Sequence, residues 1–329
     1  MKAKCVKFYE FGEPTNVLKV ENKNIHPLLR GEVLARMKVR PINPSDLIPI
    51  RGAYSHRISL PIIPGYEGVG VIEDVGEGVS RQLIGRRVLP LRGEGTWQEF
   101  VRASADLAIT IPNSINDYEA SQLYINPITA WVVCTEILKL KPGDTLLVNA
   151  GGSSISRIFA QLSRIIGFRM IGVTRNNHYT SELLQLGAFA VINTSQEPLY
   201  DSVMELTNRF RATSAIDSIG GPEGAELACC VRPKGDFLTI GLLSGIPVDW
   251  KAISQKTEVN FKLFHLRHWN QQISIHTWHE TFERLITFIT EKKLALMRNG
   301  SQYNLLDVNE AVHMSDSPRQ NTGKIFLTS

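Results

Sequence analysis

The chain has 329 residues, of which 43% are hydrophobic and 21% are charged, a composition typical of a soluble protein with room for two domains. Its formal net charge of +4 is small and evenly spread, which argues against a nucleic-acid partner. The chain starts without the apolar stretch of a signal peptide, contains no window approaching the roughly 18 apolar residues of a membrane span, and has no Cys-x-x-Cys pair, so we expect a cytoplasmic protein with reduced thiols and no membrane contact.

The N-terminal third predicts short strands separated by turns. Apolar and polar residues alternate over residues 31–41, as they do along a half-buried strand. A β-branched run over 68–75 predicts another strand, and the glycines after it mark turns. Between the two, Asn43-Pro44-Ser45-Asp46 predicts the start of a helix, with a side-chain cap and a proline in the first turn.

From residue 117 onward, longer helices alternate with strands. Apolar residues at helical spacing predict a helix over 120–137. The strands expected after it are 145–149, 169–174, 190–193, 215–218 and 236–240, and the helices between them are 155–166, 181–186, 203–209 and 224–231. Strands separated by helices in this way predict βαβ units, and therefore an α/β domain with a doubly wound parallel sheet.

The C-terminal part closes the predicted fold. Residues 261–266 are expected to form the last strand of the parallel sheet, and an amphipathic helix is expected over about 278–291. A closing strand over 324–328 ends a segment too small to fold alone, so we expect this tail to pack on the N-terminal domain. The predicted division is one domain of residues 1–122 and 272–329, and a second of residues 123–271.

The segment LLVNAGGSSISRIFAQLSRIIG, residues 146–167, predicts a strand, a glycine-containing turn and a helix. In this context the helix N-terminus offers free backbone N–H groups to a pyrophosphate. The glycine pattern is imperfect, because Ser154 and Ser156 stand where glycines would allow close approach. An ordinary strand-to-helix turn therefore remains the alternative.

The end of the next strand bears on the choice of cofactor. A NAD site places Asp or Glu about 20 residues after the glycine turn, whereas Arg175, Asn176 and Asn177 follow the strand here. A guanidinium pairs with a 2′-phosphate, which an acid would repel. The sequence therefore favours NADPH over NADH. The alternative for Arg175 is a solvated loop arginine.

Several short segments occur in a specific order and spacing. They are NPSDLIPIRGAY at 43–54, PGYEGVGVIEDVG at 64–76, GTW at 95–97, INPITAW at 125–131, LLVNA at 146–150, TRNN at 174–177, FHLRHW at 264–269 and GKIFL at 323–327. In this order they resemble the zinc-independent medium-chain dehydrogenase/reductase superfamily over essentially the whole chain, above all the mitochondrial-type trans-2-enoyl-CoA/ACP (2-enoyl thioester) reductases and next the quinone oxidoreductases. The resemblance implies a Rossmann domain for residues 123–271. It also implies a GroES-like, mainly β catalytic domain split between the N- and C-terminal segments.

The resemblance also implies that no metal is bound. In the alcohol dehydrogenase branch, a cysteine and a histidine that precedes a glutamate hold the catalytic zinc. The corresponding stretches here read Asn43-Pro44-Ser45-Asp46 and Gly65-Tyr66-Glu67, and residues 95–102 lack the cysteines of the structural zinc lobe. His276 and His279 lie three apart on an expected helix, and we interpret them as surface or boundary histidines.

Without zinc as a Lewis acid, alcohol oxidation lacks its electrophile, whereas reduction of an activated double bond remains feasible. Hydride would add to the β-carbon of an α,β-unsaturated carbonyl, an enolate would form, and a proton would reach the α-carbon. In the enoyl reductases a tyrosine after the Asn-Pro-x-Asp motif is catalytic, and it corresponds to Tyr54. A phenol is protonated at neutral pH and can donate to the enolate. The alternative is a tyrosine that only packs beside the cofactor, as in many quinone reductases.

The resemblance implies further site residues, position by position. The cofactor contacts are Asn126 in the nicotinamide pocket, Gly152, Ser153, Ser154 and Ile155 at the pyrophosphate, Ile240, Gly241, Leu242 and Leu243 beside the nicotinamide, Phe264, His265, Leu266 and Arg267 after the last strand, and Lys324 near the C-terminus. The implied substrate pocket comprises Tyr54, Tyr66, Trp97 and Trp269. Without the resemblance, Asn126 would be interpreted as a helix cap and Lys324 as a solvent-exposed lysine.

Three functions remain open at this point. The first is NADPH-dependent reduction of the C2–C3 double bond of a trans-2-enoyl thioester, on CoA or acyl carrier protein, in fatty-acid metabolism. The second is a zinc-independent NADPH:quinone or enone oxidoreductase, and the third is a non-catalytic NADPH-binding sensor, suggested only by the serines in the glycine turn. Related proteins are commonly homodimers through an edge strand of the Rossmann sheet, and residues 261–266 are the candidate for that strand.

Overall fold

The structure, a computed structural model, describes residues 2–298, 300–316 and 323–329. The chain forms two compact units, one of residues Met1–Ile125 and Ser274–Ser329, the other of residues Asn126–Ile273. We call them the split unit and the central unit. The domain limits predicted from the sequence, 122/123 and 271/272, lie close to the observed divisions.

The central unit, all of which is described, is built on a parallel sheet of six strands in the order β10-β9-β8-β11-β12-β13. Its strands are β8 (Thr145–Val148), β9 (Arg169–Thr174), β10 (Ala190–Asn193), β11 (Ala212–Asp217), β12 (Val231–Thr239) and β13 (Asn260–Leu263). The strand order reverses direction between β8 and β11, which confirms the predicted doubly wound Rossmann arrangement. Every residue of β8 is buried, because helices cover both faces of the sheet.

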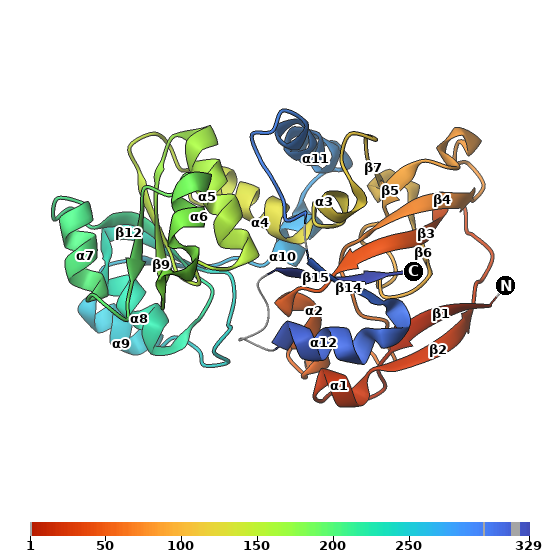
Figure 1. Ribbon diagram of the computed structural model, residues 1–329, viewed down its shortest axis with the longest axis horizontal. Helices are drawn as coiled ribbons and strands as arrows, with labels where there is room; N and C mark the ends of the chain where they lie inside the picture. The colour runs from red at the N-terminus through yellow and green to blue at the C-terminus, as the bar shows by residue number, and fades with distance from the viewer. Residues whose placement is uncertain (1, 299, 317–322) are drawn as a thin grey trace. The chain divides into compact units, whose positions relative to one another are not determined.

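The helices of the central unit lie on the two sides of this sheet, with α5 and α6 together on one side and α7, α8 and α9 on the other (Figure 1). The helices are α4 (Ile125–Val132), α5 (Ser154–Ile166), α6 (Thr180–Leu186), α7 (Leu199–Leu206), α8 (Gly221–Cys229), α9 (Trp250–Lys256) and α10 (Leu266–Gln272), with the π-helical turn η4 (Val133–Ile137) and the 3-10 turn η5 (Asn177–Tyr179). Val203 on α7, Leu227 on α8 and Phe237 on β12 belong to one fully buried cluster. Each such side chain stabilises the fold by roughly 1.5–3 kcal/mol.

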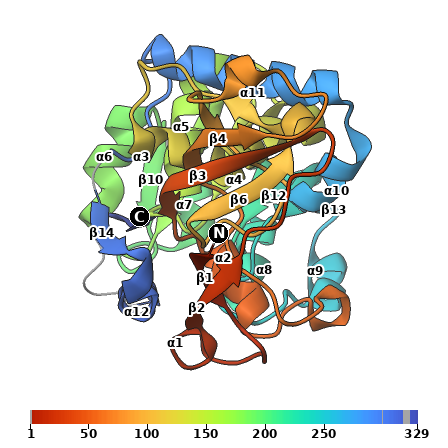
Figure 2. The same ribbon diagram turned by 90° about the vertical axis from the view of Figure 1, so that its right-hand side faces the viewer.

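The split unit contains a mainly antiparallel sheet whose described strands follow the order β14-β15-β3-β4-β5-β7, with β6 paired to β3. The strands are β3 (Glu32–Pro41), β4 (Val69–Val75), β5 (Arg87–Leu89), β6 (Phe100–Ser104), β7 (Ile109–Thr110), β14 (Gly300–Asn304) and β15 (Lys324–Thr328), and a separate pair is formed by β1 (Lys2–Lys7) and β2 (Lys19–Asn24). Figure 2 shows β3, β4 and β6 side by side. Inward-facing Val33, Ala35 and Met37 alternate along β3 and form the core of this sheet.

The C-terminal tail packs on the N-terminal part of the chain, as predicted, and there it adds strands to this sheet. β15 pairs antiparallel with β3 and parallel with β14. The helices of the split unit are α1 (Pro14–Val17), α2 (Pro44–Ile50), α3 (Asp117–Ser121), α11 (Ile275–Thr290) and α12 (Val308–Asp316), with the 3-10 turns η1 (Ser55–Arg57), η2 (Arg81–Leu83), η3 (Ala105–Leu107) and η6 (Leu305–Asp307). The helix start predicted at Asn43 is confirmed, since Asn43 caps α2 and forms a capping box with Asp46.

The continuous helix predicted over 120–137 is wrong. α3 ends at Ser121, α4 begins at Ile125, and η4 follows. The backbone N–H groups of Tyr124 and Ile125 donate to Glu67 Oε2 over 3.1 and 2.8 Å, so a carboxylate caps the start of α4. The apolar periodicity gave no sign of this break in the helix, because the acid that caps α4 lies 57 residues away from Tyr124 in the sequence.

The observed ends of other elements differ from the predicted ones for local reasons. The last parallel strand, predicted over 261–266, ends at Leu263, because the His265 side chain accepts the backbone N–H of Arg267 and caps α10. The helix predicted over 203–209 begins earlier, directly after Pro198. The patterns did not predict α9, α10, α12, β1, β2 or β14.

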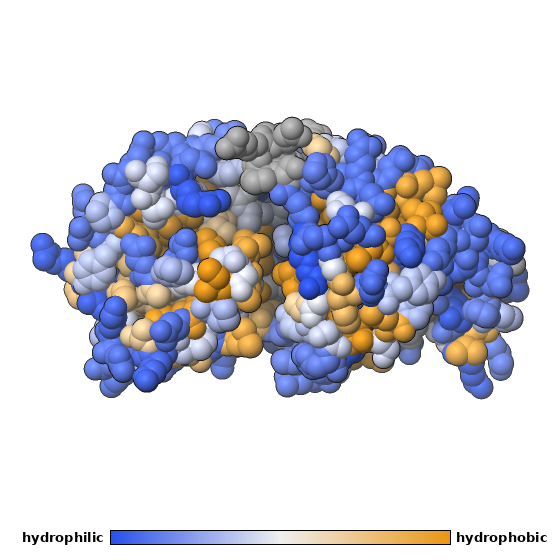
Figure 3. Space-filling model, turned by 90° about the horizontal axis from the view of Figure 1, so that it is seen from below, coloured by the Kyte–Doolittle hydropathy of each residue, from blue (hydrophilic) through white to orange (hydrophobic). Residues whose placement is uncertain are grey.

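Hydrophilic residues dominate the face shown in Figure 3, where separate apolar patches interrupt them. The most exposed large apolar side chains among the described residues are Phe210, at 79%, and Leu263, at 77%. Leu263 lies on β13, an edge strand of the central sheet. Within the described parts of the chain, no helix combines the length and the hydropathy needed to cross a membrane.

Candidate cofactor site and active-site network

The residues predicted to bind a cofactor in the central unit follow the ends of parallel strands. Residues 152–155 follow β8 at the start of α5, and residues 175–177 follow β9, 240–243 follow β12 and 264–267 follow β13. Because parallel strands share one direction, their carboxyl ends lie along the same edge of the sheet, where doubly wound proteins bind their ligands. The structure thus brings four predicted segments, far apart in the sequence, to one edge.

Two buried residues that the sequence analysis missed join this edge where the strand order reverses. Asn149 follows β8 and Asp217 ends β11, and Asn149 Nδ2 donates to Asp217 Oδ1 over 2.6 Å. Asn149 Oδ1 accepts from the backbone N–H of Ser218, and Asp217 Oδ1 accepts from those of Ile219 and Gly220. The pair ties the two halves of the sheet together at the crevice typical of dinucleotide sites. The sequence signal that could have identified this pair is an amide and an acid, each at the end of a buried strand.

The phosphate turn, residues 149–153, fits a pyrophosphate. Ser153 caps α5, since its Oγ accepts the backbone N–H of Ser156 over 3.3 Å. The backbone N–H groups of Gly152 and Ile155 donate to no residue in the described chain, which leaves them for an anion at the positive end of the helix. A Cβ on Gly151 would lie 2.7 Å from Thr174 Cγ2, so the close approach of β8 and β9 requires glycine here.

Ser156 shows how the turn accommodates a serine in place of a glycine. The side chain is fully buried, and its Oγ donates to the carbonyl oxygen of Ala150 over 3.1 Å. Ala150 has a φ of 50°, in the left-handed region that non-glycine residues rarely adopt. The serine hydroxyl therefore stabilises the strained part of the turn.

Arg175, Asn176 and Asn177 are exposed after β9. Asn177 bonds to Gln196 and Asn193 over 3.1 and 2.9 Å, and Asn176 caps the turn η5. The Arg175 side chain makes no hydrogen bond or ion pair with any residue that the structure describes. The asparagines therefore shape the loop, and Arg175 leaves a cation available to a ligand.

The other predicted residues of the central unit differ in exposure. Leu242 and Leu243 are 39% and 53% exposed, whereas Phe264 is buried. Trp269 is buried, and its Nε1 donates to Glu136 Oε2 over 3.0 Å. Arg267 is exposed, and the half-buried residues are Asn126, Ile240, Gly241, His265 and Leu266. Their contacts with a cofactor or substrate stay predictions.

The split unit contains a buried network of charged and polar groups. Lys324 Nζ donates to Asn43 Oδ1, and Asn43 Nδ2 donates to Glu67 Oε1 over 2.7 Å. Asp46 accepts the backbone N–H groups of Asn43 and Tyr66 over 2.8 and 3.0 Å. Lys324 is only 6% exposed, so its interpretation as a solvated lysine is wrong, and its contact with a cofactor stays a prediction from the resemblance.

Burial shifts all three ionisable groups of this network toward their neutral forms. Desolvation raises the pKa of Asp46 to about 7 and raises the pKa of Glu67, while it lowers the pKa of Lys324. Attraction between the ammonium and the two carboxylates opposes each of these shifts. Because an unpaired ion is costly in a core, the Lys324 ammonium and the N–H groups that donate to Asp46 and Glu67 together make two buried acids tolerable here.

Tyr54 lies just beyond α2. Its φ of 67° is in the left-handed region, a strained conformation that surrounding structure maintains at many functional positions. Its side chain is 37% exposed, and the Arg57 guanidinium lies 4.0 Å from the ring centroid. Asn43 and Asp46 begin the same helix, so α2 connects the buried network at one end to Tyr54 at the other.

The two remaining predictions for a substrate pocket in this unit have different outcomes. Tyr66 is 45% exposed, but Trp97 is fully buried and packs in a core cluster with Phe8 and Leu47. A Cβ on Gly65 would lie 2.3 Å from the Trp97 ring, so backbone also closes over the indole. The assignment of Trp97 to a substrate pocket is therefore corrected to a core position, because the motif located the residue in the chain but not whether its side chain is buried.

The positions that correspond to zinc ligands have other partners. The Asn43 amide bridges Lys324 and Glu67. Throughout the described residues, no three His, Cys, Asp or Glu side chains gather in a group that could hold a metal ion. His279 bonds to the carbonyl oxygen of Asp106 over 2.8 Å.

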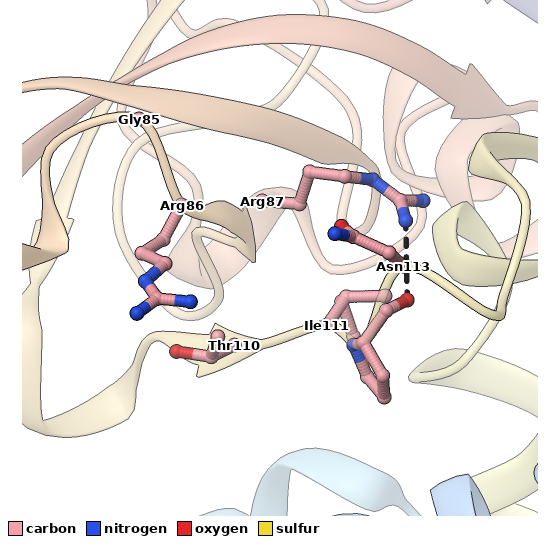
Figure 4. Close-up of a pocket in the computed structure, with 7 residues that line it drawn as sticks. Gly85, Arg86, Arg87, Thr110, Ile111 and Asn113 are labelled. Atoms are coloured by element: carbon pink, nitrogen blue, oxygen red, sulfur yellow. Dashed lines mark hydrogen bonds between the residues drawn. The ribbon is translucent and has the colours of Figure 1, made fainter.

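The split unit also has a surface cavity of about 400 Å³ beside the start of β5 and the end of β7 (Figure 4). Arg86, Thr110 and Asn113 are among its lining residues. Arg87 at its wall donates to the Pro112 carbonyl oxygen and to Asp117. The cavity contains none of the predicted site residues.

Two family models match separate parts of the chain. The alcohol dehydrogenase GroES-like domain family matches residues 29–113, and the zinc-binding dehydrogenase family matches residues 155–291. A mitochondrial enoyl-[acyl-carrier-protein] reductase from Xenopus tropicalis is 30% identical over 99% of this chain and 96% of its own. These matches support the interpretation of the split unit as GroES-like and of the central unit as a Rossmann domain.

Two solved structures are similar to nearly the whole chain. A candidate NADPH:quinone reductase from Bacillus thuringiensis is 60% identical, with a TM-score of 0.98 over 100% of this chain and 99% of its own. The mitochondrial 2-enoyl thioester reductase heterodimer from Candida tropicalis is 23% identical, with a TM-score of 0.86 over the full length of both chains. At that identity the second likeness concerns the fold alone.

Proposed function

Because the chain belongs to the medium-chain dehydrogenase/reductase superfamily, we propose that it is a zinc-independent, NADPH-dependent reductase of the C2–C3 double bond of a trans-2-enoyl thioester. The acyl group would be carried by CoA or by acyl carrier protein. The observation that carries the proposal is Tyr54, a partly exposed phenol held in a strained backbone conformation at the end of α2. The similarity to a curated enoyl reductase over 99% of the chain supports it.

The residues that hold NADPH in this proposal lie at the carboxyl edge of the central sheet. The free N–H groups of Gly152 and Ile155 bind the pyrophosphate, and Arg175 pairs with the 2′-phosphate. When bound, NADPH would supply the hydride that adds to the β-carbon of the substrate. Tyr54 Oη would donate a hydrogen bond to the thioester oxygen, where negative charge develops, and the enolate would then take up a proton at the α-carbon from the Tyr54 hydroxyl or from solvent water.

Turnover on a panel of acceptors tests this function. NADPH oxidation is followed with crotonyl-CoA, a longer trans-2-enoyl-CoA and a simple quinone. Turnover on both thioesters well above that on the quinone supports the proposal. Turnover on the quinone alone contradicts it, and NADPH binding without turnover on any acceptor moves the protein to the sensor class.

Quinone or enone reduction is the second candidate. The 60% identical structure named as a candidate NADPH:quinone reductase favours it. The two candidates share the cofactor site and differ in the acceptor. A quinone needs no phosphopantetheine arm, so competition by CoA separates them: free CoA should inhibit an enoyl-CoA reductase and leave quinone turnover unaffected.

Replacing Arg175 with alanine is expected to weaken NADPH binding by about tenfold to a hundredfold, because a charge-assisted contact to the 2′-phosphate is lost. The dissociation constant for NADH should not change. Fluorescence titration with both nucleotides measures the two constants. Arg209→Ala, which removes another exposed arginine of the central unit, is the control, and equal losses for NADPH and NADH would contradict the assignment.

We also propose a cytoplasmic homodimer. β13 is an edge strand of the central sheet and carries Leu263, which is 77% exposed. An exposed apolar edge of this kind suits pairing with a second copy. Sedimentation of the wild type and of Leu263→Lys, expected to favour the monomer, tests the dimer.

A further inference from the structure

Arg157, Glu182 and Tyr179 enclose the carbonyl side of Gly152, and we call these three residues the Gly152 clip. Arg157 lies on α5, just after the phosphate turn, and its Nη1 donates to the Gly152 carbonyl oxygen over 2.6 Å. Its Nε and Nη2 donate to the two carboxylate oxygens of Glu182 on α6 over 2.7 and 2.8 Å. Each guanidinium nitrogen thus has an acceptor, in the bidentate geometry that fixes orientation as well as charge.

The third side of the clip is aromatic. The Arg157 guanidinium lies 5.1 Å from the centroid of the Tyr179 ring. A Cβ on Gly152 would lie 2.3 Å from Tyr179 Cε2, so the ring packs directly against this glycine. The Arg157 side chain is only 11% exposed, which makes the contact more rigid than a surface ion pair.

The clip acts on one peptide plane. The peptide that joins Gly152 to Ser153 is held through its carbonyl oxygen by Arg157, and through its N–H by the carbonyl oxygen of Ala150 over 2.9 Å. Because a peptide unit is planar, these two bonds set its rotation. That rotation determines how the chain passes from Gly152 into Ser153, and therefore where Ser153 caps α5 and how the first N–H groups of that helix are oriented.

We propose that Arg157 is a positioning residue for the phosphates of the dinucleotide, which acts through the Gly152 carbonyl and not as a phosphate-binding cation. This inference rests on the proposed NADPH site. The turn has serines at two positions where glycine is typical. Contacts from α5, α6 and η5 hold its backbone in place of the close packing that orders a glycine-rich turn, and so orient its N–H groups. Glu182 holds Arg157 away from the phosphates, and the Arg157 hydrogen bond lowers the pKa of Glu182.

The two possible roles of Arg157 predict opposite signs for Glu182→Gln. If Arg157 bound phosphate, removing the competing carboxylate would free its charge and tighten NADPH binding. If it positions the turn, the same change loosens the clip, and we expect the dissociation constant for NADPH to rise about tenfold. Arg157→Lys, which keeps the charge but loses the bidentate geometry of the guanidinium, should raise the dissociation constant similarly. Tyr179→Leu, which changes no charge, should do the same.

The measurements are the dissociation constants for NADPH at low and high salt, the melting temperature without cofactor, and kcat at saturating NADPH. Arg164→Lys, on an exposed position of α5, and Glu205→Gln, on an exposed position of α7, are the matched controls. We expect the clip variants to lose affinity for NADPH while kcat and the KM for the acceptor stay constant. General unfolding would not change the one constant and leave the other two unaffected.

The outcomes separate the inference from the proposed function. A wild-type protein that does not bind NADPH overturns the proposed function. A wild-type protein that binds NADPH, with Glu182→Gln binding it equally or more tightly, overturns the inference alone. If Arg157→Lys is unstable, Tyr179→Leu and Glu182→Gln still show whether the dissociation constant for NADPH rises or falls. Both residues lie near the surface, so their replacement should not unfold the protein.

Discussion

Replacing Tyr54 with phenylalanine is expected to lower kcat for a trans-2-enoyl thioester by about a hundredfold or more, because general acid assistance typically contributes 10²–10⁴ in rate. The change removes one oxygen and keeps the ring that packs against Arg57. The KM for NADPH and the melting temperature should therefore stay close to those of the wild type. Initial rates with crotonyl-CoA at saturating NADPH measure the effect.

Tyr200→Phe is the matched control for this experiment. Tyr200 is 36% exposed, close to the 37% of Tyr54, and it too has an arginine against its ring, Arg211 at 5.4 Å. It lies on α7, outside every proposed site. If both variants reduced the thioester at the wild-type rate, Tyr54 would be a packing residue, and the quinone reductase would become the leading candidate.

Replacing Lys324 with methionine is expected to reduce the free energy of unfolding at pH 8 by about 3–5 kcal/mol, because it leaves the buried carboxylates of Glu67 and Asp46 without their cation. Methionine keeps most of the apolar volume, so the loss reports on charge and not on packing. Urea denaturation measures it. Lys293→Met is the control, since Lys293 is a surface lysine paired with Glu291, and such pairs contribute about 0–1 kcal/mol.

The destabilisation should depend on pH with a definite sign. The folded pKa of Asp46, about 7, lies above its ordinary value of 3.8, so the folded state holds a proton that the unfolded state releases in this window. Stability from this group is therefore highest at low pH and falls as the pH rises from about 4 to 7. Removing the ammonium raises the pKa of both acids further, so the difference between Lys324→Met and wild type should shrink at pH 5. A difference that is equally large at pH 5 and pH 8 would contradict a charge-based role.

Glu67→Gln combined with Lys324→Met completes the test. The double variant loses the cation together with one of the acids that it compensates. We expect it to be more stable at pH 8 than Lys324→Met alone, the coupling that defines residues in one network. Purely additive losses would show that Lys324 and Glu67 act independently.

Much of the central unit could be predicted from the sequence, because its signals are local. Apolar runs bounded by turns predicted β8 and β9, and the glycine turn before α5 predicted the phosphate turn at its observed place. Arg175 follows β9 in the chain, so its position at the edge of the sheet followed from strand direction alone. Such features depend on neighbours within a few residues, which the sequence displays directly.

Contacts between distant segments depended on the tertiary structure. Glu67 interrupts an apparently continuous helix by accepting N–H groups 57 residues away or more, and Lys324 reaches Asn43 across 281 residues. Arg157 meets Glu182 from a different helix. No periodicity records these pairs, because they form only when the packing of separate elements brings the side chains together.

Hydrophobic periodicity and turn chemistry act over a few residues, so the alternation of strands and helices, the phosphate turn and the residue types at the carboxyl edge of the sheet follow from the amino-acid order alone. That Trp97 is a core residue, that Lys324 is buried among acids and that Arg157 donates to a carbonyl oxygen became visible when the chain was folded. Whether a polar side chain is solvated, paired or buried depends on what the rest of the chain places against it.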